Sequence, residues 1–447
     1  MSAHTLPLPT ASQAPATRQL PSLLSRILRC ASAALLNYGG GQVIRLGGNL
    51  ILTRILVPEA FGLMALINVF VIGLNMFSDV GLGPSIIRKK VNPSLQFLQT
   101  AWTLQIIRGL VLTLLLVGLA YPISQFYGEP QLLFLIPVLA IRETIMGFRS
   151  VQFFVEEREM RHMGPTLLNL STALIGLIAA VLLAWSLNSV WALVWSGLIS
   201  AILNVLASHL FLPACPHRIH WDSEAAKELL KFGKWILAST ALAFIATQGD
   251  RLVLGKMLTM EELGIYTVAF FFAQASTSLL SGISNRVLLP MLSQKECNNF
   301  EKRRRTYGNY RLGFAALGLP LLGIFAGWGS PIIAHLYDAR YASAGPMLEI
   351  LSLGAAAAVL RSFCQPLILS AGDGSRRTLL SAVEGILLMA LITAGHNLAG
   401  MNGLLWGWVV AQWGSLFVAH CLVRKYSIHR IYPDLIFLSA ITIIFLL

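Results

Sequence analysis

The stretch GGNLILTRILVPEAFG at residues 47–62 decides how the rest of the chain should be divided, because it occurs twice. At an offset of 202 it aligns with GDRLVLGKMLTMEELG at residues 249–264. The identical pairs are Gly47 with Gly249, Leu50 with Leu252, Leu52 with Leu254, Leu56 with Leu258, Glu59 with Glu261, and Gly62 with Gly264. Arg54 also aligns with Lys256, so a basic residue recurs. The sequence therefore predicts two copies of one structural unit.

Both copies lie in a chain that is too apolar for a water-soluble protein. Of 447 residues, 56% are hydrophobic and 12% are charged, whereas an average globular protein has about 25% charged residues. The mean hydropathy is +0.70. Lipid must therefore be the solvent for most of the chain, and disordered, collagen-like and disulfide-scaffold proteins are excluded. The net charge of +13 is best read as an excess of cytoplasmic Lys and Arg.

Apolar stretches of about 20 residues predict twelve helical spans, without the alternation typical of strands. They lie near 31–57, 61–87, 97–124, 129–153, 166–187, 189–213, 232–257, 263–290, 311–336, 345–371, 378–397 and 400–423. A shorter apolar run, Ile431 to Leu447, ends the sequence. Six spans separate the two copies, so both halves enter the membrane in the same direction. We predict an all-α polytopic membrane protein with two six-helix lobes related by an axis along the membrane normal, twelve core transmembrane helices and an extra C-terminal segment.

The basic residues orient these spans. Alternate connections carry 24 Lys and Arg on one side and three on the other, which predicts a cytoplasmic N-terminus. The same distribution argues against nucleic acid as a partner and favours contact with anionic lipid. The expected divisions are a cytoplasmic tail at 1–30 with an interfacial helix from Leu20 to Cys30, lobes at 31–213 and 232–423, a cytoplasmic linker at 214–231, and a loop with the extra hydrophobic segment at 424–447.

No motif for metal, cofactor or enzymatic chemistry is present in the sequence. The five cysteines are scattered without metal-ligand spacing. There is no Gly-rich phosphate loop, HExxH pair or GxSxG elbow, and no outward loop exceeds about a dozen residues. We therefore expect neither a metal nor a cofactor, and we do not expect an enzyme.

Two longer stretches resemble a known family. Residues 52–90 and 250–293 are similar to the polysaccharide-transporter, or Wzx-type oligosaccharide flippase, branch of the multidrug/oligosaccharidyl-lipid/polysaccharide flippase superfamily. The second stretch is the more specific, through Asp250, Arg251, Gly255, Gly264, Ile265, Tyr266, Arg286, Pro290 and Ser293. Members usually have twelve or fourteen spans. The thirteenth run therefore implies either a final helix missing after Leu447 or a segment that lies in the membrane interface.

The resemblance also implies a function. It implies a bacterial inner-membrane transporter that moves a polyprenyl-diphosphate-linked oligosaccharide from the inner to the outer leaflet by alternating access. The product would be a surface polysaccharide such as O-antigen of lipopolysaccharide, capsule or exopolysaccharide. The expected partners are this lipid-linked oligosaccharide, membrane lipid and polysaccharide-assembly proteins, with proton or sodium coupling or the membrane potential as the energy source.

Charged residues inside the spans are the candidate site. A charge at the middle of a span costs roughly 2.5–3.5 kcal/mol on insertion scales, so it needs a partner or a water-filled cavity. The in-span arginines are Arg45, Arg108, Arg142, Arg251, Arg286 and Arg361. The central acids are Asp79, Glu143, Asp250 and Glu384. Because the cations outnumber the acids, a cavity that they line should attract an anion.

Helical spacing places several polar residues on one stripe. In the first span Tyr38, Gln42, Arg45 and Asn49 recur at i, i+4, i+7 and i+11. The eighth span repeats the arrangement with Gln274, Ser278, Ser281 and Asn285. By the offset of 202, Asn49 corresponds to Arg251, so each half presents one arginine at nearly the same depth. Two guanidinium groups are suited to clamp a diphosphate. The candidate substrate-binding residues are Tyr38, Gln42, Arg45, Asn49, Arg251, Gln274, Arg286 and Arg361.

Alternatives to this interpretation remain open. Arg251 and Arg286 could extend toward the membrane surface, and Arg142 with Glu143, like Arg108 with an acid such as Asp79, could form structural pairs. Asp79, Glu143 and Asp250 are candidates for ion coupling. The competing functions are a drug or cation exporter of the same superfamily, a membrane polysaccharide polymerase or ligase, and a scaffold of an assembly complex. The excess of arginine disfavours the cation exporter, and the short outer loops disfavour the enzyme.

Overall fold

The computed structural model describes residues 23–78, 81–88, 93–159, 161–213, 217–293 and 300–425. Most of the expected N-terminal tail, the coupling candidate Asp79 and the apolar run Ile431–Leu447 lie outside these residues. The backbones of Tyr38 and Arg286 are helical, but their side chains are outside the description.

The described residues form fourteen α-helices and one 3-10 turn, and none of them is in a strand. The α-helices are α1 (Leu23–Ile55), α2 (Pro58–Phe77), α3 (Leu82–Arg88), α4 (Leu95–Tyr127), α5 (Leu132–Gly147), α6 (Gln152–Arg158), α7 (Met163–Leu187), α8 (Trp191–Leu210), α9 (Ser223–Met257), α10 (Met260–Ser293), α11 (Phe300–Leu336), α12 (Ala344–Ser362), α13 (Cys364–Ser370) and α14 (Gly374–Arg424); the turn is η2 (Ala339–Tyr341). The prediction of an all-α protein is confirmed.

Each of the twelve expected spans coincides with helical residues. Seven described segments are long and apolar enough to cross a membrane: Pro58–Ile87, Leu95–Tyr127, Met163–Leu187, Trp191–Leu210, Tyr307–Leu336, Ala344–Ser370 and Gly374–Arg424. The last segment holds two expected spans, because α14 is interrupted by non-helical backbone at Ala399 and Gly400. Gly400 has a φ of +56°, a conformation that suits glycine. Gly395 and Gly403 then pack backbone to backbone across the turn.

Two helix starts differ from the expected divisions. α9 begins at Ser223, upstream of the expected start of its span at residue 232, because Asp222 caps the helix by accepting a hydrogen bond from the Glu224 amide (2.9 Å). The first turns of α9 bury Ala225 and Leu229 in a cluster with residues of α3 and α4. α1 runs without a break from Leu23, so the described part of the expected interfacial helix forms the first turns of α1.

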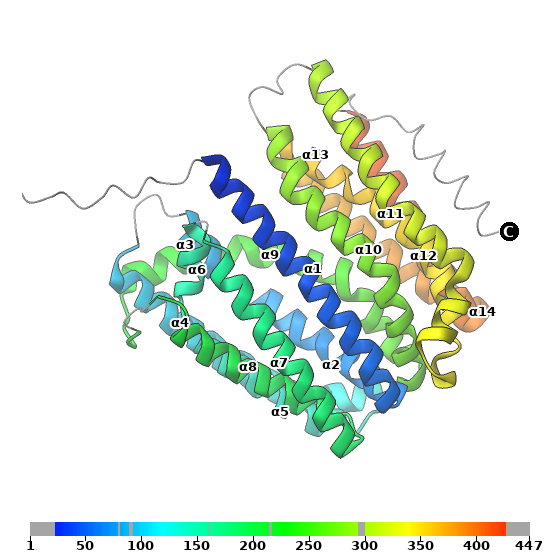
Figure 1. Ribbon diagram of the computed structural model, residues 1–447, viewed down its shortest axis with the longest axis horizontal. Coiled ribbons are helices and arrows are strands. Elements are labelled where there is room, and N and C mark those ends of the chain that lie inside the picture. The colour runs from blue at the N-terminus through cyan, green and yellow to red at the C-terminus, as the bar shows by residue number, and fades with distance from the viewer. Residues whose placement is uncertain are drawn as a thin grey trace, which may run out of the picture.

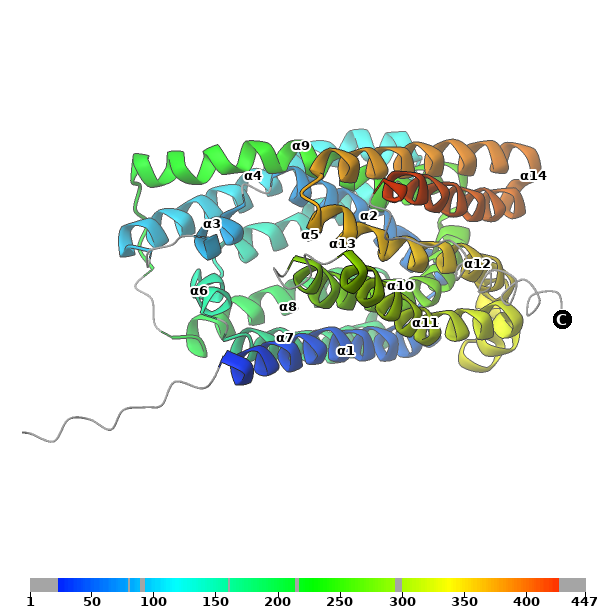
Figure 2. The same ribbon diagram turned by 90° about the horizontal axis from the view of Figure 1, so that it is seen from above.

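The helices run roughly parallel to one another in one bundle (Figure 1). We call α1–α8 the first half and α9–α14 the second half. α1 and α7 lie along one side of the bundle, and α9 and α14 lie along the opposite side (Figure 2). The halves meet mainly where α2 packs against α9 and α10, with further contacts between α4 and α9 and between α1 and α10. The most extensive hydrophobic cluster of the described residues includes residues of both halves.

Repeat-related glycines form the tightest part of this junction. A Cβ atom on Gly62 would lie 2.8 Å from the carbonyl carbon of Met260, and one on Gly264 would lie 2.7 Å from that of Pro58. Positions 58 and 62 are related to 260 and 264 by the offset of 202, so the contact is reciprocal. Only glycine permits this approach of α2 and α10. It lies at the end of the bundle where α1 stops and α2 begins, which we call the α1–α2 end.

Candidate functional site

The polar stripe of α1 faces the second half of the chain. Gln42 Nε2 donates a hydrogen bond to Ser278 Oγ of α10 (3.0 Å). Asn49 Oδ1 accepts one from the hydroxyl of Tyr337, which directly follows α11 (2.6 Å). The stripes that the sequence places on the first and eighth spans therefore meet. Arg45 lies between the two contacts on the same stripe, so its side chain is directed to the same side of α1.

Arg45 itself is exposed. Among the residues that the structure describes, no hydrogen-bond or ion-pair partner is found for its guanidinium group. It precedes Ile55, the last residue of α1, by ten positions, or roughly 15 Å along the helix axis. That is half the thickness of a hydrocarbon core of about 30 Å. An exposed cation at this depth requires water or an anionic ligand next to it.

Other polar groups along the two stripes are also available to form hydrogen bonds with a ligand. The Oε1 atom of Gln42 is buried and has no hydrogen-bond partner among the described residues. On α10, Gln274 is exposed, whereas Ser278 and Ser281 donate to the carbonyl oxygens of Ala275 (3.0 Å) and Ser278 (3.2 Å). The region between α1 and α10 thus offers one guanidinium group and two amides.

Arg251, the proposed counterpart of Arg45, is partly engaged within the second half. Its Nη1 atom donates to Gln248 Oε1 (2.9 Å), and its guanidinium carbon lies 5.3 Å from the centre of the Phe270 ring. The neighbouring Asp250 is only 3% exposed. Its Oδ1 atom has no hydrogen-bond partner in the described part of the chain, and neither does the buried hydroxyl of Tyr266. Asp250 is thus a buried acid with an unused oxygen.

The first half contains a second polar cluster, between α2, α4 and α5. Glu143 is 7% exposed and pairs with Arg142 (3.1 Å), one of the alternatives left open by the sequence. Asn75 joins this acid to another cation: its Nδ2 donates to Glu143 Oε2 (2.9 Å), and its Oδ1 accepts from Arg108 Nη2 (3.0 Å). Arg108 Nε also donates to Ser78 Oγ (3.0 Å). The sequence analysis missed Asn75, although its place in an apolar span was a signal.

Arg361 is held in a third cluster, inside the second half. It is 6% exposed and forms an ion pair with Glu384 of α14. Its Nη2 atom also donates to Gln412 Oε1, in the second part of α14 (3.0 Å). The sequence shows no acid close to Arg361, because Glu384 reaches it only through helix packing. The side chain is consequently engaged by two residues of its own half.

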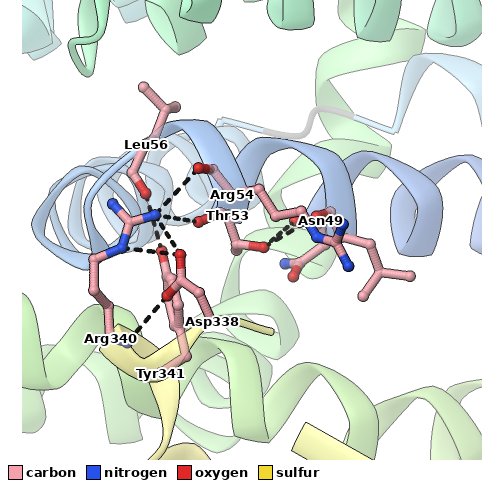
Figure 3. A network of polar contacts seen from close by, with 8 residues as sticks. Asn49, Thr53, Arg54, Leu56, Asp338, Arg340 and Tyr341 are labelled. Carbon is pink, nitrogen blue, oxygen red and sulfur yellow. Dashed lines mark hydrogen bonds and ion pairs between the residues drawn. The ribbon is translucent and has the colours of Figure 1, made fainter. Parts of the chain in front are cut away.

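A fourth network lies at the α1–α2 end and joins the two halves (Figure 3). Arg340 of η2 forms an ion pair with Asp338 and donates to the carbonyl oxygens of Thr53 (3.3 Å) and Arg54 (3.2 Å) near the end of α1. The Tyr341 hydroxyl donates to the Leu56 carbonyl oxygen (3.4 Å). The Arg340 side-chain hydrogen bond lowers the pKa of Asp338. In the sequence, Arg340 is one of the three basic residues in the connections of the less basic side, and nothing there indicates this network.

The apolar helices of the bundle define a multi-pass membrane protein, and polar clusters lie inside its spans. The chain belongs to the polysaccharide biosynthesis protein family, whose model matches residues 51–346. The resemblance found from residues 52–90 and 250–293 is thereby confirmed.

Relatives in sequence include two proteins of surface-polysaccharide synthesis. The succinoglycan biosynthesis transport protein ExoT of Rhizobium meliloti is 22% identical over 73% of this chain and 65% of its own length. The lipopolysaccharide biosynthesis protein WzxC of Escherichia coli is 23% identical over 84% of this chain and 76% of its own length. The chain thus spans about two thirds to three quarters of the length of these relatives.

Solved structures share the fold. The lipid II flippase MurJ in an inward closed conformation matches with a TM-score of 0.72 and 12% identity, covering 95% of this chain and 92% of its own. An inward-facing multidrug resistance transporter of the MATE family, in the MOP superfamily, matches with a TM-score of 0.69 and 14% identity over 90% of this chain and 98% of its own. An outward-facing structure of that family matches with a TM-score of 0.60 and 15% identity, covering 90% of this chain and 95% of its own.

Proposed function

We propose that this protein is a flippase that moves a polyprenyl-diphosphate-linked oligosaccharide from the inner to the outer leaflet of the bacterial inner membrane, for surface-polysaccharide synthesis. The observation that carries the proposal is Arg45, an exposed cation at mid-span for which the described residues supply no hydrogen-bond or ion-pair partner, and which lies between two hydrogen bonds to the other half of the chain. The two relatives in polysaccharide synthesis and the fold shared with a lipid II flippase support the choice of substrate.

The chemistry of the two stripes suits this substrate. The guanidinium group of Arg45 keeps its charge and can bind two phosphate oxygens at once. The amides of Gln42 and Gln274 can exchange hydrogen bonds with sugar hydroxyl groups. Tyr38 of α1 and Arg286 of α10 are further substrate candidates, one on each of the two helices that carry a polar stripe. Arg251 and Arg361 would act on the substrate only after leaving Gln248 and Glu384.

We further propose a mechanism of alternating access between two six-helix lobes, residues 31–213 and 232–423. The reciprocal contact of Gly62 with Gly264 supports this division, because residues related by the repeat meet each other there. The positive-inside rule places the N-terminus in the cytoplasm and the α1–α2 end on the outer side. In this mechanism the contacts at the α1–α2 end close the outer side, as an inward-facing state requires.

The energy source has two candidates. An inside-negative potential favours export of an anion by about 2.3 kcal/mol per charge per 100 mV. Proton or sodium exchange would use Asp79, Glu143 or Asp250. Of the two acids that the structure describes, Glu143 is bonded to Arg142 and Asn75, whereas Asp250 retains an oxygen without a hydrogen bond. Asp250 is therefore the better placed of these two.

Transport in vesicles of both orientations tests the function. A fluorescent polyprenyl-diphosphate oligosaccharide should cross the bilayer with the wild type, and Arg45→Ala should slow it by roughly 10- to 100-fold, the loss of one or two hydrogen bonds to a charged group. Arg45→Lys should be intermediate, since lysine keeps the charge without the bidentate geometry. Arg161→Ala, which removes a surface ion pair with Glu159, is the matched control. Movement of an organic cation but not of this lipid would instead indicate a drug exporter, and lengthening of the glycan would indicate an enzyme.

A further inference from the structure

Two tyrosines occupy equivalent places in the two halves. α4, which holds the third expected span of the first half, ends at Tyr127; α11, which holds the third of the second half, ends at Leu336 and is followed by Tyr337. The Tyr127 hydroxyl donates to the Leu252 carbonyl oxygen of α9 (3.2 Å), and the Tyr337 hydroxyl donates to Asn49 Oδ1 of α1 (2.6 Å). Each tyrosine thus reaches from its own half to the first span of the other.

The acceptors are also related by the repeat. Leu252 corresponds to Leu50, the neighbour of Asn49, at the offset of 202. The two tyrosine contacts therefore follow the same approximate twofold relation as the contact of Gly62 with Gly264. The contacts of Tyr127, of Tyr337 and of Gly62 with Gly264 thus follow one approximate twofold symmetry, and all three join the two halves at the α1–α2 end.

A basic side chain reinforces each contact. Lys256 of α9 donates to the carbonyl oxygen of Phe126, the neighbour of Tyr127. On the other side, Arg340 donates to the carbonyl oxygens of Thr53 and Arg54 in the last turn of α1. A cation at the C-terminal carbonyls also interacts favourably with the helix dipole.

The two tyrosine contacts differ in the group that accepts the hydrogen bond. Leu252 accepts through its main chain, within a helix, so no competing side-chain ligand can withdraw this acceptor. Asn49 accepts through its side-chain amide, which can rotate away. Asn49 lies one turn from Arg45 on the same stripe. A ligand bound at Arg45 is therefore within reach of the group that holds Tyr337.

We propose that Tyr127 and Tyr337 are latches that close the outer side of the transporter, that a ligand does not release the Tyr127 latch directly, and that the Tyr337 latch is released when a diphosphate-linked ligand at Arg45 engages Asn49. The assignment of the two tyrosines as latches is based only on the hydrogen bonds that they donate. Their assignment to the outer side and their release by ligand rest on the proposed function.

Access from each side of the membrane tests the latches without any ligand. A cysteine at position 274, in a chain whose five native cysteines are replaced, is treated with a membrane-impermeant maleimide in right-side-out and inside-out vesicles. Y127F, Y337F and Asn49→Ala should each raise the rate of labelling from the outer side by about 2- to 10-fold, the effect of one hydrogen bond. Y121F, which alters an exposed tyrosine of the same α4 helix, should leave the rate unchanged.

A double-mutant cycle shows whether Asn49 and Tyr337 act through each other. The combined Asn49→Ala and Y337F variant should label no faster than either single variant, because both remove the same bond. Y127F combined with Y337F should instead multiply the two increases. Multiplied effects in the first combination, or rates equal to those of Y121F, would overturn the latches. A rise confined to inside-out vesicles would support the latches and refute the proposed orientation.

Release by ligand has its own readout, the distance between spin labels at positions 186 and 343, which are exposed residues of the two halves near the α1–α2 end. Farnesyl diphosphate, a short polyprenyl diphosphate, should lengthen this distance in the wild type and have no further effect in Y337F. If it leaves the wild type unchanged while Y337F lengthens the distance, release by ligand is overturned and the latches stand.

Discussion

The contact of Gly62 with Gly264 predicts how a single methyl group would shift the protein between the closed and open states of the proposed mechanism. In Gly62→Ala the new Cβ would lie 2.8 Å from the Met260 carbonyl carbon and 3.1 Å from the Gly264 nitrogen. Carbon atoms pack at about 3.5–4.0 Å, and the carbonyl oxygen of Met260 would lie closer still to the new Cβ, so α2 and α10 must separate by at least about 1 Å at this point. Neither helix can give way by a side-chain rotation, because the obstructing atoms are backbone.

The energetic effect follows from the cost of overpacking, which is about 1–3 kcal/mol. This cost falls on the closed α1–α2 end and is relieved when that end opens. The equilibrium should therefore shift toward the open state by about 5- to 150-fold. Gly264→Ala should produce the same shift, since its Cβ would meet Pro58 in the reciprocal position.

Spin-label distances between positions 186 and 343 would measure the shift. The matched control is Gly118→Ala on α4, where an added Cβ has no neighbour within 4 Å and should stabilise its helix slightly. Distance distributions that are the same for Gly62→Ala, Gly264→Ala and Gly118→Ala would refute the reasoning. So would a shift in one glycine variant without the other, because the contact is reciprocal.

Two further predictions concern ion pairs. Glu384→Gln leaves Arg361 buried without its carboxylate and should destabilise the protein by about 3–5 kcal/mol; thermal unfolding in detergent should show a clearly lower midpoint, and an unchanged midpoint would mean that water already compensates the charge. Asp338 has a lowered pKa through its hydrogen bond from Arg340, so its contribution is complete above its ordinary pKa of 3.8 and is lost only as the pH falls through the lower, folded-state value. The spin-label distance should consequently be constant between about pH 5 and pH 8, and a lengthening in this range would contradict an ion pair of Asp338 with Arg340 that stays intact.

Local patterns in the sequence were sufficient for the fold class and for the direction of the α1 stripe. Hydropathy and helical period depend only on neighbouring residues, so the expected spans fall on helices and Gln42, Arg45 and Asn49 share one face. The same reasoning placed the helix starts less well. α9 begins upstream of its apolar stretch because an N-cap and an amphipathic first segment, packed on α3 and α4, extend the helix beyond it.

The partners of the in-span charges could not be read from the sequence. Glu384 reaches Arg361 from another helix, and Asn75 connects Glu143 with Arg108 from a third. Such pairs depend on the rotation and crossing of whole helices. Hydrophobic packing fixes both, and neither is encoded near the paired residues.

The sequence by itself determined that this is a helical membrane protein, that it contains a repeat, and that its spans carry more arginines than acids. Only the tertiary structure decided which partners the described arginines among them have. Arg361 is buried against Glu384, Arg251 is held by Gln248, and Arg45 stands exposed between two contacts to the other half. The physical reason is that the composition gives only the number of charges in the spans. Which of them are neutralised depends on how closely the helices approach one another, as at Gly62 and Gly264.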